Sequence, residues 1–326
     1  MRIIFLGTPE FSVPSLDAIF KSKHELVGVI TRIDKSNERG NKVEFSPVKK
    51  YALKNNIPLF QFAKLSRDGV ETIKELKPDL MVTASYGQII SQEILDIPTF
   101  GIINVHGSLL PMYRGASPIQ TAILNGDSKT GVTIMKTEAG LDTGDIILTE
   151  EMDIKPNETA GELGARMSVV GANLLIRVIE QIENGTATYT KQSFIESSVT
   201  TRINKEDGKI IWSKSARQIK CQVLAQNPSP ISFSYLNGEL CKIYRAIENR
   251  EIKSTNKPVG TVIEPTHVKK GIFVQTGSGV LEILELQKAG GKVLSAKDFI
   301  NGRKIKLGDK FDTEINVETV APTMIE

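Results

Sequence analysis

Cysteine and histidine are scarce in this chain of 326 residues, which contains two cysteines and three histidines. Cys221 and Cys241 belong to no Cys-x-x-Cys motif and have no neighbours at the spacing of metal ligands. We therefore expect no bound metal. Two unpaired cysteines are also typical of a protein of the reducing cytoplasm, where we expect both thiols to be buried or half-buried.

Long apolar runs and nucleotide-binding loops are absent as well. No run of about 18 apolar residues occurs, so we expect no membrane span and no membrane partner. The phosphate-binding patterns G-x-G-x-x-G and G-K-[ST] are missing, and so is the G-x-S-x-G motif of serine hydrolases. These absences argue against a dinucleotide enzyme, a P-loop nucleotidase and a serine hydrolase.

Charge is unevenly distributed, although the net charge is only +3. Residues 1–200 carry 21 Lys and Arg against 24 Asp and Glu, whereas residues 201–310 carry 20 against 10. The last sixteen residues carry four acidic residues and no Lys or Arg. A near-neutral first part and a basic second part indicate a catalytic domain joined to a module that binds a polyanion.

The first part alternates short apolar runs with amphipathic runs, which predicts a layered α/β fold. We expect buried parallel strands over 3–6, 26–31, 80–85 and 102–105. We expect helices over 14–21, 47–55, 69–77 and 118–125. A more exposed pair of strands follows over 131–137 and 145–153, and a long helix over 159–184 ends a catalytic domain of residues 1–188.

The second part has a different pattern. Residues 189–203 are rich in serine and threonine and are predicted to be a linker. We then expect a helix over 213–224 and strands over 231–235, 240–244, 258–263, 271–275 and 280–286. Turns between these strands are typical of a small barrel. The predicted basic domain spans 204–311, and an acidic tail spans 312–326.

The best candidate for a reactive site begins in the run GIINVHGSLLP, residues 101–111. Asn104 and His106 lie two positions apart, so on a strand their side chains point to the same face. His106 ends an apolar run beside a glycine turn, whereas His24 and His267 lie in polar, turn-like segments. Asn104 and His106 are therefore candidate catalytic residues.

A second run, GLDTGD over residues 140–145, puts Asp142 in a loop between two glycines. Aspartate is a common turn former, but ligands of open α/β sheets bind outside the carboxyl ends of the strands. We expect this loop to meet the His106 region there. An amide, an imidazole and a carboxylate together suit attack on a carbonyl group, because they supply an oxyanion donor, a titratable ring and an anion that orients it.

Four motifs stand out in the first part: MRIIFLGTPEF (1–11), NVHGSLLP (104–111), YRGASPIQ (113–120) and GVTIMKTEAGLDTGD (131–145). Further motifs follow at INKEDGK (203–209), Trp212 and SAKDFING (295–302). Together they resemble the methionyl-tRNA formyltransferase family over nearly the whole chain. The front motifs are shared with other enzymes that use 10-formyltetrahydrofolate, and the opening motif and second half are particular to this family.

The resemblance implies a Rossmann-like α/β formyltransferase domain followed by a smaller, OB-like β-barrel domain. It implies a catalytic trio of Asn104, His106 and Asp142. It implies contacts to 10-formyltetrahydrofolate from four residues, Ser108, Leu109, Leu110 and Pro111. The implied reaction is direct attack by the α-amine of methionyl initiator tRNA through a tetrahedral intermediate, with no metal and no obligatory protein partner.

The resemblance also implies that a loop over residues 31–46 reaches the acceptor end of the tRNA, with Arg39 and Lys42 as tRNA-binding residues. The family has a Gly-Arg-Gly-Lys-Lys run there, and this chain has ERGNK. Glu38 and Asn41 therefore reduce the positive charge of the loop. In the second half, Leu224 replaces an arginine of the family and Ser229 replaces a tryptophan.

Three alternatives follow from the same residues. Formyl transfer to a small amine, such as an amino sugar or a purine precursor, predicts the same first part without need of a basic second domain. A nucleic-acid-binding module on an inactive scaffold predicts loss of Asn104, His106 or Asp142, and all three are present. A folate-binding hydrolase that releases formate stays open.

Overall fold

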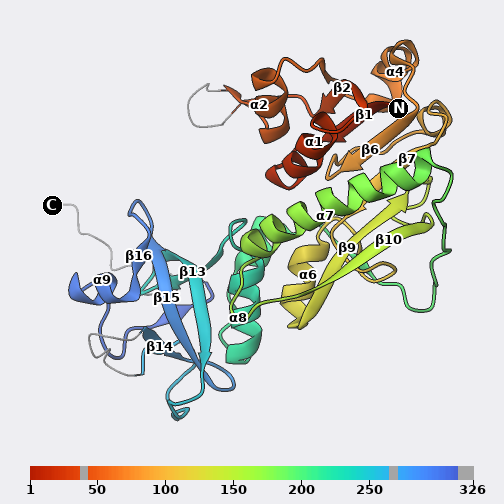
Figure 1. The fold of residues 1–326 in the computed structure, drawn as a ribbon. Coiled ribbons are helices and arrows are strands. Elements are labelled where there is room, and N and C mark those ends of the chain that lie inside the picture. The colour runs from red at the N-terminus through yellow and green to blue at the C-terminus, as the bar shows by residue number, and fades with distance from the viewer. Residues whose placement is uncertain (37–42, 264–270, 315–326) are drawn as a thin grey trace. The chain divides into compact units, whose positions relative to one another are not determined.

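The computed structural model describes residues 1–36, 43–263 and 271–314, and it divides into two compact units (Figure 1). Unit 1 comprises Met1–Pro118, Lys129–Asp153 and Leu163–Thr201. Unit 2 comprises Ile119–Ser128, Ile154–Glu162 and Arg202–Glu326. Each unit is thus assembled from segments that are separated in the sequence.

Unit 1 contains a seven-stranded mixed sheet of order β10-β9-β7-β6-β1-β2-β5. Its strands are β1 (Arg2–Gly7), β2 (Glu25–Thr31), β5 (Leu59–Gln61), β6 (Leu80–Ala84), β7 (Ile102–His106), β9 (Lys129–Lys136) and β10 (Ile146–Asp153). The pairings among β1, β2, β5, β6 and β7 are parallel, and β9 and β10 are antiparallel to their neighbours. The four predicted parallel strands are confirmed to within one or two residues.

This sheet differs from the prediction at two strands. The short strand β5 was not predicted, because its three residues are half-buried and carry no periodic signal. The strands β10 and β9 were expected to be a more exposed pair, which holds for β10, whereas every residue of β9 between its two terminal lysines is buried. It pairs with both β7 and β10, so it lies inside the sheet and brings Thr133 beside His106 in register.

The helices of this part of the chain are α1 (Val13–Phe20), α2 (Pro47–Lys54), α3 (Leu65–Asp68), α4 (Val70–Leu76), α5 (Gln92–Leu95), α6 (Pro118–Asn125) and α7 (Ala160–Glu183). The helix α2 begins at Pro47, and the side chain of Ser46 accepts from Lys49 N. At the start of α7, Glu162 N donates to Thr159 Oγ1 and Thr159 N donates to the Glu162 carboxylate, which is a capping box. These caps explain why both helices begin close to the predicted positions.

Several very short elements complete this description. They are the strands β3 (Lys35–Ser36), β4 (Val43–Glu44), β8 (Arg114–Gly115) and β11 (Val199–Thr200), and the 3-10 helices η1 (Glu10–Ser12) and η2 (Lys205–Gly208). The strand β11 pairs in parallel with β8, and Thr190 forms a bridge with Ile146. The segment predicted to be the linker therefore lies against unit 1 up to about Thr200. Within the described ranges, no helix is both long and apolar enough to cross a bilayer.

Unit 2 contains a curled antiparallel sheet of order β14-β15-β13-β12-β17, with β16 paired to β15. Its elements are α8 (Ala216–Ala225), β12 (Ser232–Leu236), β13 (Glu239–Asn249), β14 (Ile272–Gln275), β15 (Val280–Lys288), β16 (Leu294–Ser295), α9 (Ala296–Asn301) and β17 (Phe311–Asp312). The curl encloses an apolar core in which the rings of Trp212 and Phe311 lie 5.4 Å apart. Most of the predicted acidic tail, from residue 315, lies outside the described residues.

The segment 258–263, which we predicted to be a strand, forms only isolated bridges, and these connect it to both edges of the curled sheet. Gly260 N donates to Gln275 O next to one edge at 2.8 Å, and Phe311 N donates to Gly260 O at the other at 2.9 Å. Gly260 has a φ of +84°, and a Cβ there would lie 2.1 Å from Phe311 O. Glycine is therefore required where the two edges meet.

We predict that Gly260→Ala destabilises unit 2 by about 2 kcal/mol or more, because it adds both backbone strain and a backbone clash. Gly238→Ala is the matched control: its φ is also +84°, but nothing lies within 4 Å of the added Cβ. The control should cost about 1 kcal/mol. Urea denaturation of both variants measures the difference, and equal costs would contradict the assigned role of the clash.

Candidate active site

His106 is fixed at the carboxyl end of β7 between two oxygen acceptors. The residue is only 5% exposed. Its Nε2 lies 2.9 Å from the carbonyl oxygen of Tyr113, and its Nδ1 lies 3.6 Å from Asp142 Oδ2. Since a carbonyl oxygen can only accept, Nε2 carries the hydrogen of this bond. Nδ1 therefore faces the carboxylate, at a distance too long for a direct hydrogen bond.

Asp142 reaches the ring from the loop between β9 and β10. Its backbone is left-handed, with a φ of +50°, and Gly115 N donates to its Oδ2 at 2.7 Å. The two loops that the sequence singles out thus meet at one edge of the sheet, on the side where the parallel strands end. The side chain of Asp142 is 17% exposed, so its carboxylate is accessible from outside while one oxygen is held.

Asn104 is held by the neighbouring strand β6. The hydroxyl of Thr83, which pairs with Asn104 in the parallel register, donates to Asn104 Oδ1 at 2.8 Å. Because its oxygen is occupied, the amide presents its NH₂ group for donation to another oxygen. Thr83 was not among the predicted site residues, since nothing in its apolar strand marks it as functional.

The turn after β7, residues 108–111, is fixed from the other side by β9. Thr133 Oγ1 donates to Ser108 O at 2.7 Å and accepts from Leu110 N at 3.1 Å. Ser108 is fully buried, and its hydroxyl donates to Met112 O at 2.6 Å. The serine side chain is thus committed to the shape of the turn, and Leu109 and Pro111 are half-buried on it.

One residue that contacts the site, Gln192, was not predicted from the sequence, and two predicted tRNA-binding residues cannot be placed in it. Gln192, from the predicted linker, donates to Asp142 O and Gly144 O and so contacts the loop that carries Asp142. The serine- and threonine-rich composition of residues 189–203 is typical of a linker, so this contact was not predicted. Arg39 and Lys42 lie outside the described residues.

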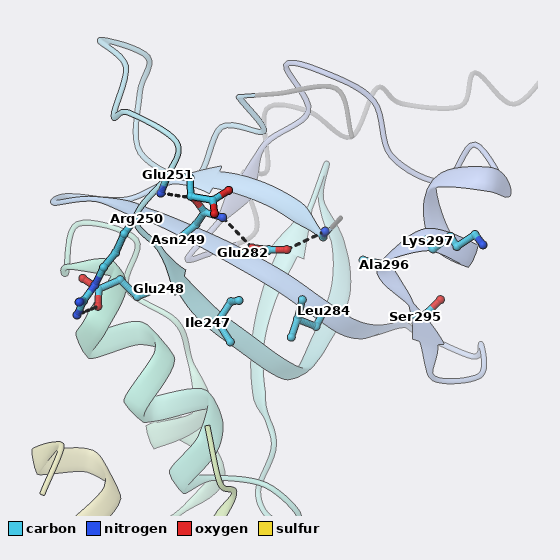
Figure 2. A pocket seen from close by; sticks show the side chains of 11 residues that line it. Ile247, Glu248, Asn249, Arg250, Glu251, Glu282, Leu284, Ser295, Ala296 and Lys297 are labelled. Atoms are coloured by element: carbon cyan, nitrogen blue, oxygen red, sulfur yellow. Dashed lines mark hydrogen bonds and ion pairs between the residues drawn. The ribbon is translucent and has the colours of Figure 1, made fainter. Parts of the chain in front are cut away.

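Unit 2 contains a hollow of about 570 Å³. Figure 2 shows the side chains that line it. Its buried carboxylate, Glu282, accepts from Asn249 Nδ2 at 2.8 Å and from Gly271 N at 3.0 Å. Arg250 and Lys297 also line it, and none of the predicted catalytic residues does. Because Glu282 already has two donors, we assign the hollow no part in the chemistry. Among the described side chains, no group of three or more His, Cys, Asp or Glu is arranged to hold a metal ion.

Two family models match the chain: formyl transferase over residues 1–179, and formyl transferase, C-terminal domain, over residues 202–304. The chain therefore belongs to the formyl transferase family. It is similar to the methionyl-tRNA formyltransferase of Fusobacterium nucleatum, with 42% identity over 312 residues, 95% of this chain and 99% of the relative. The enzyme of the same name from Alkaliphilus oremlandii is 44% identical over 312 residues, with the same coverage.

A solved structure supports the same fold. A sugar 3N-formyl transferase, crystallised in the presence of dTDP and 5-N-formyl-THF, has a TM-score of 0.64 and 25% sequence identity. The alignment covers 90% of this chain and 99% of that one. The two proteins thus share a fold over most of both chains.

We predict that Thr83→Val slows formyl transfer about 5- to 10-fold, because it removes the donor that fixes the Asn104 amide while keeping the volume of the side chain. Thr83→Ser keeps the hydroxyl and should retain most of the rate. Single-turnover rates for the two variants measure the effect. If the valine and serine variants react equally fast, the Thr83 hydroxyl does not position Asn104.

Proposed function

We propose that this protein transfers the formyl group of 10-formyltetrahydrofolate to the α-amino group of methionine esterified to initiator tRNA. The main support is the similarity of 95% of the chain to methionyl-tRNA formyltransferases, at 42–44% identity in the two relatives above. The packing of His106 against Asp142 beside Asn104 supplies groups suited to this chemistry. Such a substrate implies action in the cytoplasm, where translation begins.

In the proposed mechanism, Asn104 donates its amide hydrogens to the formyl oxygen as the amine attacks the formyl carbon. His106 adds a second donor from Nδ1 when its ring is protonated, because the 3.6 Å gap leaves this nitrogen uncommitted to Asp142. Asp142 stabilises the charged ring and accepts the proton of the amine through water. The new C–N bond then replaces the bond to N10 of the folate, N10 leaves with the proton that Asp142 had accepted, and no covalent enzyme intermediate forms.

The turn over residues 108–111 is the proposed contact with the folate. Leu109, Leu110 and Pro111 supply apolar surface, and Ser108 contributes through the backbone shape that its hydroxyl maintains. The sugar formyl transferase that shares this fold was crystallised with a formyl-folate, which agrees with a folate co-substrate here. We propose no metal for this reaction.

A tRNA acceptor is favoured over a small amine. The sugar formyl transferase is only 25% identical to this chain, whereas the tRNA enzymes are 42% and 44% identical. The excess of 20 basic over 10 acidic residues in 201–310 suits phosphate contacts. We propose that this part, residues 204–311, is an OB-like domain that binds the tRNA body. We propose that Arg39 and Lys42 act at the acceptor end.

We predict that Asn104→Ala and His106→Ala each lower the chemical step by about 10² or more, because each removes a donor to the developing oxyanion. Single-turnover formylation of charged initiator tRNA gives the rate, and circular dichroism checks the fold. Charged elongator tRNA serves as the specificity control with the unmodified protein. A folded Asn104→Ala protein that reacts as fast as the unmodified one would disprove the oxyanion role.

We predict that tRNA affinity falls steeply with salt and depends on the basic surface of unit 2. Lys297→Glu and Lys306→Glu change exposed residues there and should weaken binding. Each lost phosphate contact makes the log–log salt slope less steep by up to about 0.9. Lys54→Glu, at an exposed position on helix α2 of unit 1, is the control and should change neither quantity.

The measurement is a salt titration of tRNA binding to the full-length variants. The full chain is used because residues 119–128 and 154–162 belong to unit 2, so cutting after unit 1 would leave them without partners. Affinity and slope that stay unchanged in both unit 2 variants would argue for a small-amine acceptor.

A further inference from the structure

Gln192 is a buried amide whose hydrogen-bonding capacity is fully used. It is 8% exposed. Arg114 donates to its Oε1 twice, from Nε at 3.0 Å and from Nη2 at 2.8 Å. Its Nε2 donates to Asp142 O at 2.9 Å and to Gly144 O at 2.7 Å. A primary amide has two lone pairs and two hydrogens to offer, and all four are engaged here.

The guanidinium of Arg114 strengthens this arrangement. Arg114 is only 4% exposed, and in the part of the chain that the structure describes no ion pair joins it to a carboxylate. Its remaining contact of note is the ring of Phe194, at 5.3 Å from the centroid. A buried cation on the amide oxygen polarises the amide and makes its N–H groups better donors. The positive charge therefore supports the two bonds that Gln192 makes to the Asp142 loop.

These two bonds fall where the loop needs support. Asp142 adopts a left-handed backbone, which is unfavourable for a residue with a side chain. Gly115 N holds the carboxylate, and Gln192 holds the main chain at residues 142 and 144. Gly115 and Arg114 together form β8, so one short strand controls both the side chain and, through Gln192, the backbone of Asp142.

We propose that Gln192, held by Arg114, is a positioning residue that sets the carboxylate of Asp142 against Nδ1 of His106. This inference rests on the proposed function for its kinetic consequence. The hydrogen bonds of the Gln192 side chain go to Arg114 and to the backbone of Asp142 and Gly144, so it acts through the Asp142 loop. Its effect should therefore appear in the rate of transfer more than in the binding of the folate.

The decisive variant is Gln192→Glu. A carboxylate still accepts from Arg114 but has no hydrogen for the carbonyls of Asp142 and Gly144, and it places negative oxygen against them. Gln222→Glu is a matched control in unit 2, where Gln222 Nε2 donates to the carbonyls of Asp207 and Lys209 at 3.1 and 3.0 Å. Both variants lose the same pair of bonds, but only Gln192 supports Asp142.

We expect Gln192→Glu to slow single-turnover transfer about 10- to 30-fold, the effect of two lost hydrogen bonds, with affinity for 5-formyltetrahydrofolate changed less than about threefold. Gln222→Glu should leave the single-turnover rate at saturating tRNA unchanged. If Gln192→Glu does not fold by circular dichroism, Gln192→Asn takes its place. Its amide is one methylene shorter and cannot span Arg114 and both carbonyls.

A second readout needs no substrate. The chain has three histidines, so nitrogen NMR resolves few ring signals, and His106→Gln assigns those of His106. Gln192→Glu or Gln192→Asn should move the ring nitrogen signals of His106, and Gln222→Glu should not. A folded Gln192 variant with unmoved His106 signals and an unmodified rate overturns the proposal. If the unmodified protein forms no formyl-methionyl-tRNA, the proposed function fails, and the NMR comparison still decides the role of Gln192.

Discussion

The position of the His106 imidazole, between the carbonyl oxygen of Tyr113 and the carboxylate of Asp142, determines the geometry of the whole site. His106 is nearly buried, so its ring is costly to place unless its nitrogens have partners. The Tyr113 carbonyl takes one nitrogen, and this fixes where the second one points. Tyr113 has a φ of +60°, a turn that brings the chain after β7 back over the ring. Asp142 must then approach the remaining nitrogen, Nδ1, which requires the left-handed loop and its supports.

Each part of the proposed site is therefore held by a residue outside the predicted catalytic trio. Thr83 holds Asn104, Thr133 holds the turn after β7, and Gly115 and Gln192 hold Asp142. Two of these four come from strands inside the sheet, β6 and β9, whose apolar residues are buried. The other two are Gly115, on β8, and Gln192, in the segment that leads to β11. The strands β8 and β11 pair with each other. Precision at the site thus comes from hydrogen bonds between segments far apart in the sequence.

This arrangement explains what the sequence predicts well and what it does not. Apolar runs and period-two alternation located β1, β2, β6 and β7, and placed Asn104 and His106 on one strand face. Local patterns carry no information about which loop a polar side chain will reach, so Gln192 was assigned to a linker and Thr83 passed unnoticed. The same limit applies in unit 2. Residues 258–263 have the composition of a strand, yet their bonds are divided between two edges of the sheet.

The segments of the two units alternate along the sequence, and this affects how the protein folds during its synthesis. Residues 119–128 and 154–162 leave the ribosome early, but the rest of their unit begins only at Arg202. During synthesis these segments emerge before the residues from Arg202 onward that complete their unit, so unit 2 cannot fold until those later residues have been made. An incomplete translation product exposes the surfaces of both segments, which makes it a ready target for chaperones or proteases.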